Sequence, residues 1–274
     1  MRQKLAEKVV FITGASSGIG EQLAREAAAQ GAAVVLVARR SELIARLAAE
    51  IEAGGGQALA VAGDVTRDGD MEVAVAEGLA RFGRLDIAIA NAGFSVNGPV
   101  ANLRIDDFRR QFDTNVLGVI RTVQAVMPAL TASRGSIGFM GSTNSYLSLP
   151  GYSAYCASKH AVRSLADCLR HELGDKRVSV TLLAPGFVQS DIRLLDNQGR
   201  HRQGAIDPIP NWLQLPGRRA ARQMLCAIQA RRAESIITMH SRLSIFAARH
   251  LPWLVSAILR VARGPLIAAA QQQP

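Results

Sequence analysis

A tyrosine and a lysine four residues apart are the side chains best suited to chemistry in this sequence. Tyr155 and Lys159 stand in the stretch GYSAYCASKHA, in a chain with only three tyrosines and four lysines. Residues four apart on a helix share one face. A free phenol has a pKa of about 10, too high for efficient proton exchange at neutral pH, and a neighbouring ammonium lowers it. The spacing predicts that Tyr155 is a general acid/base tuned by Lys159.

Two further polar residues fall where they can serve the same reaction. Ser142 ends an expected strand over 135–142, and its hydroxyl could polarise a substrate carbonyl beside Tyr155. Asn115, in TNVLG, lies inside an expected long helix over 106–131, where asparagine is a middling helix former. Its side chain could hold a water molecule between Lys159 and solvent, which would give the proton a path out.

A glycine-rich turn near the N-terminus has the features of a dinucleotide site. The sequence ITGASSGIGEQLA follows an apolar run and opens a helix, with glycines spaced G-x-x-x-G-x-G. Such a turn lets the backbone approach a pyrophosphate, and a helix N-terminus offers free N–H groups. An ordinary glycine-rich turn is the alternative, but the order strand, turn, helix favours the cofactor. The predicted cofactor contacts here are Gly14, Ser16, Ser17, Gly18, Ile19 and Gly20.

The end of the next strand distinguishes the two nicotinamide cofactors. An acid there would bind the adenosine ribose 2′-OH and repel a 2′-phosphate. The sequence VLVARRSE instead has Ala38, followed by Arg39 and Arg40. Paired guanidinium groups favour the extra phosphate, so NADP(H) is predicted in preference to NAD(H). The alternative is that Arg40 merely faces water.

Two later segments complete the expected cofactor site. Asp64 ends the third apolar run and could accept a hydrogen bond from the adenine amino group, with Val65 beside it. In the NAG sequence, Asn91, Ala92 and Gly93 leave room for the adenosine ribose. Either segment could instead be a turn signal, so each depends on the glycine turn for support.

The elements that must position these residues alternate along the chain. Apolar runs predict strands, with helices between them and a capping Ser41 at the start of the second helix. The strands are expected at 8–14, 32–38, 57–65, 85–93, 135–142, 178–186 and 235–239. These runs are continuous, as in a parallel sheet buried on both faces. The fold class is therefore α/β: a single-domain, Rossmann-like, doubly wound parallel sheet over 1–240, with a helical C-terminal extension over 241–274.

The motifs, taken in order, resemble those of the short-chain dehydrogenase/reductase family over about residues 5–240. They are TGASSGIG, NAG, the Asn of TNVLG, Ser142, YCASK and PG. The resemblance implies a catalytic tetrad of Asn115, Ser142, Tyr155 and Lys159, with Tyr155 and Lys159 also contacting the cofactor. It implies activity on a carbonyl/secondary alcohol pair and a homodimer or homotetramer.

The same resemblance extends the cofactor site. It places Ile12 beside the cofactor and adds contacts after the sixth strand, at Pro185, Gly186, Val188 and Ser190. Ser190 stands where the family usually has a threonine that binds the nicotinamide carboxamide. Ala90 replaces the first Asn of the family's NNAG motif. Both departures are mild.

The segment 187–217 is expected to cover the substrate site. Its apolar residues could line a pocket: Leu194, Leu195, Ile206, Ile209, Trp212 and Leu213. Its arginines could meet an anionic tail: Arg193, Arg200 and Arg202. The alternative is a mobile, solvated loop.

Most of the net charge of +10 belongs to the C-terminal quarter. Residues 193–263 hold twelve arginines against three acids, which gives +9. An arginine-rich solvated face, anionic lipid and nucleic acid are the alternatives. No nucleic-acid motif accompanies the charge, so no nucleic-acid partner is expected. The tail is suited to a membrane surface, with arginines edging an apolar face and a break expected at Pro252. Its charge-free run of 251–259 is too short to span a bilayer. The alternatives are that the tail packs over the substrate cleft or lines an oligomer interface.

The remaining composition bounds the compartment and the class of function. Three cysteines without metal-ligand spacing suit a reducing cytoplasm, with no disulfide and no metal expected. The N-terminus lacks the long apolar stretch of a signal peptide. The predicted function is an NADP(H)-dependent oxidoreductase of a lipophilic substrate, cytoplasmic or peripheral at a membrane. The alternatives are a 3-oxoacyl thioester reductase of lipid metabolism and a non-catalytic NADPH-binding scaffold.

Overall fold

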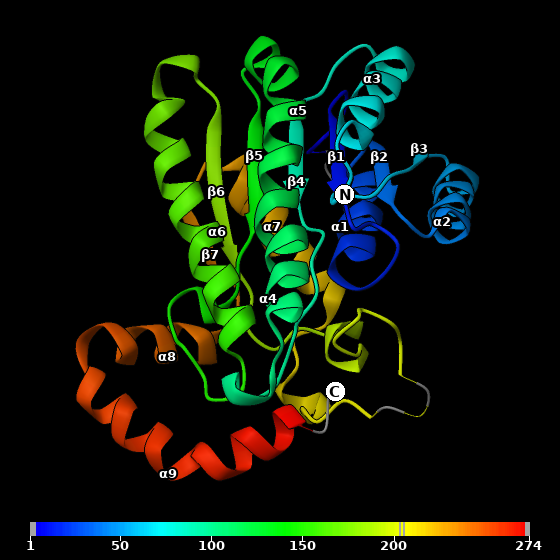
Figure 1. Ribbon diagram of the computed structural model, residues 1–274. Coiled ribbons are helices and arrows are strands. Elements are labelled where there is room, and N and C mark those ends of the chain that lie inside the picture. Colours follow the sequence, from blue (N-terminus) through cyan, green and yellow to red (C-terminus); the bar gives the residue numbers. More distant parts are fainter. Residues whose placement is uncertain (1–3, 203, 205, 272–274) are drawn as a thin grey trace.

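Seven short apolar segments form one parallel sheet in the computed structural model, which describes residues 4–202, 204 and 206–271 (Figure 1). The sheet order is β3-β2-β1-β4-β5-β6-β7. The strands are β1 (Val9–Thr13), β2 (Ala33–Ala38), β3 (Gln57–Ala62), β4 (Ile87–Ala90), β5 (Ser136–Met140), β6 (Ser179–Ala184) and β7 (Glu234–Ile236). The central strands are buried on both faces because helices cover both. The predicted doubly wound sheet of seven strands is confirmed.

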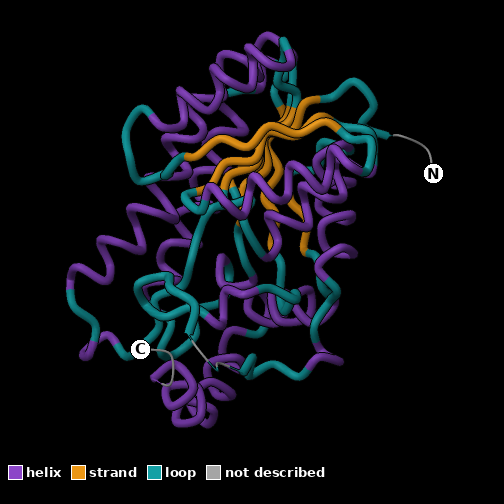
Figure 2. The backbone as a smooth tube through the Cα atoms, turned by 90° about the vertical axis from the view of Figure 1, so that its right-hand side faces the viewer, coloured by secondary structure: helices purple, strands orange, loops and turns teal. Residues whose placement is uncertain are grey.

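Helices cover the two faces in separate layers, visible on either side of the strands in Figure 2. One layer contains α1 (Gly18–Ala29), α2 (Ser41–Ala53) and α7 (Gly217–Gln229). The other contains α3 (Asp70–Phe82), α5 (Gly118–Ser133) and α6 (Ser153–Glu172). Short 3-10 turns are η1 (Val100–Asn102), η3 (Thr143–Ser145), η4 (Gly174–Lys176), η5 (Asp191–Leu194) and η6 (Asn211–Leu213). Two apolar cores result, one under each layer.

The long helix expected over 106–131 is confirmed as one helical stretch, Ile105–Ser133, but it contains a turn that the sequence did not predict. A π-helical turn, η2 (Asp113–Leu117), lies between α4 (Ile105–Phe112) and α5. A π turn inserts an extra residue per turn, and such turns are frequent at functional sites. The N-cap of α2 is Arg40, so Ser41 is already the first helical residue and does not have the predicted capping role.

The sheet topology gathers the loops that follow the strands at one edge. β1 pairs with β2 on one side and with β4 on the other. The connections that follow β1 and β4 therefore diverge to opposite faces, and this divergence opens the crevice in which doubly wound sheets bind ligands. The loops after β5 and β6 end at the same edge, since all seven strands are parallel. The residues predicted for chemistry belong to these loops and to the helices that follow them.

The tail forms two helices, α8 (Met239–His250) and α9 (Pro252–Gln271), and the break predicted at Pro252 is confirmed. In Figure 1, α9 is the red arc below the sheet. Two helical stretches of the described chain are long and apolar enough to cross a membrane, at Ile105–Ser133 and Pro252–Ala270. The first lies against the sheet, whereas only 6% of the second is buried. By length and composition alone, α9 therefore meets the criterion for a membrane-crossing helix with two arginines in it, although its charge-free run of 251–259 is short.

Candidate active site

The glycine turn after β1 has no room for side chains at two positions. Gly14 has φ +67°, and a Cβ there would lie 2.8 Å from Ala92 Cα. A Cβ on Gly20 would lie 2.2 Å from the Gly14 carbonyl oxygen. The turn therefore packs tightly against the loop after β4. Immediately beyond it α1 begins at Gly18, and its first N–H groups receive no capping bond from the Ser17 side chain.

Arg40 reaches across this turn. Its guanidinium donates to the Ser16 hydroxyl at 2.8 and 3.2 Å and to the Ser17 hydroxyl at 2.7 Å. The group remains exposed to solvent. Arg39 lies further out, with 65% of its side chain exposed and its nearest guanidinium nitrogen 4.0 Å from an Asp64 carboxylate oxygen. One fixed guanidinium thus lies beside the open end of α1, an arrangement that fits a phosphorylated dinucleotide.

Thr13 is a residue of this region that the motif reading missed. Its buried hydroxyl accepts hydrogen bonds from the backbone N–H groups of Asn91 and Ala92, each at 3.1 Å. The Asn91 side chain donates to the carbonyls of Thr13 and Gly14. The end of β4 is therefore tied directly to the glycine turn. Thr13 is the first residue of the TGASSGIG motif, but its role depends on β4, which is distant in sequence.

The Asp64–Val65 segment is partly committed to the fold. One Asp64 carboxylate oxygen accepts from both the backbone and the hydroxyl of Thr66, at 3.0 and 2.8 Å. Val65 is 7% exposed and packs closely on Gly118: a Cβ on Gly118 would lie 2.7 Å from the Val65 Cγ2 atom. Their predicted contacts with adenine stay predictions.

Lys159 projects from α6 into the sheet edge. It is 4% exposed, and its ammonium donates to the Met140 carbonyl at the end of β5, at 2.7 Å. The ammonium also lies 5.7 Å from the centre of the Tyr155 ring. Burial lowers the pKa of Lys159 to about 8. A lysine with such a pKa can exchange a proton near neutrality.

The pKa of Tyr155 is not lowered as predicted. Burial raises it to about 12, and a hydrogen bond with Ser142 opposes the rise. Lys159 has no such effect in the free protein, because its ammonium is directed to the Met140 carbonyl and lies over the ring rather than beside the hydroxyl. The Ser142 hydroxyl also accepts from the backbone N–H of Asn144, at 3.1 Å, which fixes its direction. The structure thus brings Tyr155, Ser142 and Lys159 together, but the hydrogen-bond partner of the Tyr155 hydroxyl is Ser142 and not Lys159.

Asn115 lies on the π turn and is fully buried. Its amide exchanges two hydrogen bonds with the backbone of Phe94 and donates a third to the Ser158 hydroxyl. A Cβ on Gly93 would lie 3.0 Å from the Asn115 side-chain oxygen and 3.7 Å from the Lys159 ammonium. The side chain therefore joins the loop after β4 to α6. A water held between Asn115 and Lys159 stays a prediction.

The loop after β6 passes beside both the serine and the glycine turn. Pro185 is buried, and its carbonyl accepts from the backbone N–H of Thr143 at 3.0 Å. A Cβ on Gly18 would lie 3.4 Å from the Cβ of Ser190. Val188 is 1% exposed and belongs to the core. Ile12, predicted to lie beside the cofactor, is fully buried in the same core.

In the 187–217 segment, several side chains that were expected to face the substrate instead bond other residues of the segment or face solvent. Arg193 forms a two-pronged ion pair with Asp207, with bonds of 2.6–3.0 Å, so it is not free to meet an anionic tail as predicted. Ile206 and Trp212 are 87% and 84% exposed, and they do not line a pocket. Both corrections have one cause, since the segment folds on its own polar contacts.

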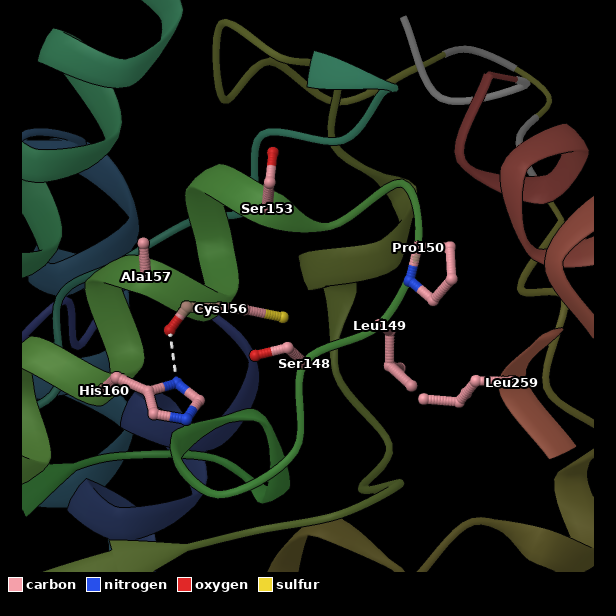
Figure 3. Close-up of a pocket in the computed structure, with 8 residues that line it drawn as sticks. All are labelled: Ser148, Leu149, Pro150, Ser153, Cys156, Ala157, His160 and Leu259. Atoms are coloured by element: carbon pink, nitrogen blue, oxygen red, sulfur yellow. Dashed lines mark hydrogen bonds between the residues drawn. The ribbon is translucent and has the colours of Figure 1, made fainter. Parts of the chain in front are cut away.

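A cavity of about 440 Å³ lies near the start of α6, but not at the catalytic groups (Figure 3). Its lining comes from the loop before α6, from α6 and from Leu259 of α9. Ser153, Ala157 and His160 line it, and helical spacing places them opposite Tyr155 on α6. The cavity therefore belongs to the contact between α9 and the catalytic helix.

The sheet is doubly wound, and its carboxyl edge carries both a dinucleotide turn and a Tyr–Lys–Ser cluster. This combination is typical of a nucleotide-binding fold. The family model of short chain dehydrogenases matches residues 8–200, and the chain belongs to this family. The 11-beta-hydroxysteroid dehydrogenase 1A of Arabidopsis thaliana is 39% identical over 215 residues. Those residues are 76% of this chain but only 59% of that protein.

Solved structures agree with the fold over most of the chain. A short chain dehydrogenase/reductase of Burkholderia phymatum in complex with NAD has a TM-score of 0.82 at 26% identity, covering 92% of this chain and 96% of its own. An alcohol dehydrogenase of Thermococcus sibiricus complexed with 5-hydroxy-NADP has a TM-score of 0.74 at 27% identity, covering 84% and 95%. The 3-ketoacyl-(acyl-carrier-protein) reductase of Brucella melitensis with NADH has a TM-score of 0.74 at 29% identity, covering 85% and 97%.

Proposed function

We propose that this protein is an NADP(H)-dependent oxidoreductase that transfers a hydride between the nicotinamide and a carbonyl or secondary alcohol. The observation that carries the proposal is the cluster of Tyr155, Ser142 and Lys159 at the sheet edge that also carries the glycine turn. A protein that only binds a dinucleotide has no need of a buried lysine beside a tyrosine. For that reason catalysis is preferred to the scaffold alternative.

The roles follow from the pKa values. With a pKa of about 12, Tyr155 holds its proton at the phenolic oxygen throughout the physiological range. In reduction it donates that proton to the substrate oxygen, while Ser142 donates a hydrogen bond to the same atom. Bound NADPH would supply the hydride to the carbonyl carbon. The phenolate regains a proton from Lys159, whose pKa of about 8 suits a relay.

The preference for NADP(H) rests on Arg40. Its guanidinium is already held over the Ser16 and Ser17 hydroxyls, where a 2′-phosphate could take two donors at once. The strand β2 ends at Ala38, so no carboxylate at that position repels the phosphate. NAD(H) is the less favoured cofactor on the same grounds.

A lipophilic substrate is favoured by the apolar tail beside the catalytic helix. The tail exposes large apolar side chains such as Trp253, Ile258 and Val261, which would suit an enzyme that takes its substrate from a membrane. The cavity near the start of α6 lies on the face of that helix opposite Tyr155 and is not the substrate site. The 3-oxoacyl thioester alternative is supported by the likeness to a 3-ketoacyl reductase structure, and a hydroxysteroid-type substrate by the likeness to the plant relative. A homodimer or homotetramer, which light scattering would detect, stays a prediction.

The test is oxidation of NADPH, followed by the absorbance of the reduced nicotinamide, with a panel of ketones, aldehydes and 3-oxoacyl thioesters. Controls use NADH and the Tyr155→Phe variant. Turnover should fall at least about 100-fold in the variant, since a positioned acid contributes about that much, while NADPH binding remains. Comparable loss of NADPH affinity would contradict the assigned role. Tight NADPH binding without any turnover would favour the scaffold.

A second candidate role is attachment to an anionic membrane surface through α8 and α9. The exposed side chains there combine large apolar groups with arginines, and residues 235–274 contain no Asp or Glu. The exposed apolar residues are Met239, Leu243, Phe246, Leu251, Trp253, Leu254, Ile258 and Val261. Apolar burial and attraction to anionic headgroups act together on such a surface. The protein would then be peripheral at the cytoplasmic face, with 241–274 acting as its membrane-contacting extension.

Sedimentation with vesicles tests this role. Full-length protein should sediment with vesicles of mixed anionic and zwitterionic lipid at low salt, and much less with zwitterionic lipid alone. A variant with Trp253→Ser and Val261→Ser should remain in solution. Failure of the unchanged protein to sediment with anionic vesicles would end the proposal, and retention on DNA instead would favour a nucleic-acid role.

A further inference from the structure

The first turn of α8 packs against the loop after β6. A Cβ on Gly186 would lie 2.1 Å from the Ser241 hydroxyl and 2.4 Å from both His240 Nε2 and the Thr238 hydroxyl. Three polar side chains from the start of the tail therefore converge on one glycine. Only a residue without a side chain leaves room for them, so the glycine after Pro185 serves this contact as well as the turn.

His240 makes the most direct link. Its Nε2 accepts a hydrogen bond from the backbone N–H of Phe187 at 3.0 Å, and its ring stacks on the Phe187 ring with centres 4.9 Å apart. A nitrogen that accepts from a backbone amide must lack a proton. Burial lowers the pKa of His240, which favours this neutral state. The histidine thus fixes both the backbone and the side chain of Phe187.

Ser241 extends the link to the corner after β5. Its hydroxyl bonds the hydroxyls of Thr143 and Thr238, at 2.6 and 2.7 Å. Thr143 donates to the Pro185 carbonyl from both its backbone N–H and its hydroxyl, at 3.0 and 3.3 Å. The residue before Thr143 is the Ser142 that bonds Tyr155. One turn of the tail is therefore bonded to two loops of the active site.

The far end of α8 is attached to the same corner. Tyr146 follows η3, and the guanidinium groups of Arg163 and Arg249 both lie over its ring, with their central carbons 4.2 and 5.2 Å from the ring centre. The Tyr146 hydroxyl donates to Glu234 at 2.6 Å. Arg249 belongs to the last turn of α8. Both ends of the helix thus hold the segment that carries Ser142, whereas α9 is largely exposed.

We propose that His240 is a positioning residue for the cofactor, which holds the Pro185–Phe187 segment through the Phe187 amide. On this view the first turn of α8 is a working part of the active site, while the exposed apolar side chains of α8 and α9 remain available for attachment. The inference rests on the proposed function and on the predicted cofactor contacts at Pro185, Gly186, Val188 and Ser190. His240 touches neither cofactor nor substrate and acts through Phe187.

The test compares two variants of His240 in the full-length protein. His240→Leu removes the acceptor at similar volume, and His240→Gln can place a carbonyl oxygen near the position of Nε2. A part-buried N–H that loses its acceptor makes its segment costly to hold in place, so the Kd for NADPH should rise on the order of tenfold in the leucine variant. The glutamine variant should stay within about threefold of the unchanged protein. Calorimetry gives the Kd without turnover, and hydrogen exchange of the 185–190 peptide should be faster in the leucine variant alone.

Ser244→Ala is the matched control. Ser244 lies one turn further along α8, and its hydroxyl bonds only the His240 carbonyl among the hydrogen bonds described, so the Phe187 contact remains. The Kd of the Ser244→Ala variant for NADPH should not change. If His240→Leu does not fold, Ser241→Ala deletes a single hydroxyl from the same cluster, and its Kd should rise by about threefold or more.

Three results would overturn the proposal: an unchanged Kd in folded His240→Leu, equal loss in the leucine and glutamine variants, or unchanged Kd in Ser241→Ala when the leucine variant does not fold. Equal loss of NADPH affinity in the leucine and glutamine variants would mean that the His240 ring acts only by packing on Phe187. If the unchanged protein binds neither NADPH nor NADH, the proposed function itself fails. Hydrogen exchange then still reports whether His240 holds the segment.

Discussion

Replacement of Arg40 by alanine should change the cofactor preference. The side chain donates three hydrogen bonds of 2.7–3.2 Å to the Ser16 and Ser17 hydroxyls, so its guanidinium is already ordered where a 2′-phosphate would lie. Little conformational entropy is then lost on binding the phosphate. NADH has no 2′-phosphate and should not gain from this group.

The size of the effect follows from one charge-assisted contact. A hydrogen bond to a charged group contributes about 1.5–3 kcal/mol. Loss of that contact corresponds to an increase of about 10- to 150-fold in the Kd for NADPH. The Kd for NADH should change by less than about threefold, because only the two serine hydroxyls lose a donor and both can bond water.

The assay is calorimetric titration of each variant with both cofactors at low and at high salt. Arg40→Lys keeps the charge without the planar fork and should be intermediate. Arg39→Ala is the matched control, since its side chain is 65% exposed and meets Asp64 only at 4.0 Å. An equal loss of affinity for NADPH and NADH in Arg40→Ala would refute the reasoning, and so would an unchanged affinity for NADPH.

Three other substitutions test the scaffold, two of them at the glycine turn and one at the opposite end of the sheet. Gly20→Ala should abolish binding of either cofactor, measured by calorimetry, because the new Cβ would lie 2.2 Å from the Gly14 carbonyl oxygen; binding within twofold of the unchanged protein would contradict this. Thr13→Val should lower the free energy of unfolding by about 1–3 kcal/mol in denaturant titration, since two part-buried amides lose their shared acceptor; no loss would show that the amides find another partner. Burial raises the pKa of Asp86, but hydrogen bonds from Arg84 and its neighbours outweigh burial and hold it below its usual value. The stability that Asp86 contributes is therefore complete above the unfolded pKa of about 4 and is lost as the pH falls through the lower folded value, so Asp86→Asn should flatten that part of a stability–pH profile.

Much of the fold and the outline of the site followed from local pattern. Continuous apolar runs such as VVLV in β2 have apolar side chains on both faces of the strand, and both faces are buried only between two helix layers. The number and spacing of these runs therefore predicted the parallel sheet. The glycines at 14, 18 and 20 mark a turn whose backbone must approach another group, and Tyr155 and Lys159 share a helix face by spacing alone. These features depend on neighbours in sequence or on the period of one element, which a single sequence displays.

Contacts between distant segments were decided only by the tertiary structure. The pKa of Tyr155 depends on the burial of its side chain and on Ser142, whereas Lys159 on α6 donates to the carbonyl of Met140 on β5. The π turn at Asn115 is accompanied by hydrogen bonds to Phe94, twenty-one residues earlier. The periodicity of a sequence does not predict such hydrogen bonds, because each one depends on which distant segments the fold brings together.

The tail shows the same division. Its arginines, its apolar residues and the break at Pro252 are legible in the sequence, and they predict two amphipathic helices. That His240 would accept from the Phe187 amide, fifty-three residues away, is not legible there. Composition determines which surfaces are apolar and which are charged, since those properties belong to single residues. Packing determines which polar groups meet, since a hydrogen bond needs two partners brought within about 3 Å by the whole fold.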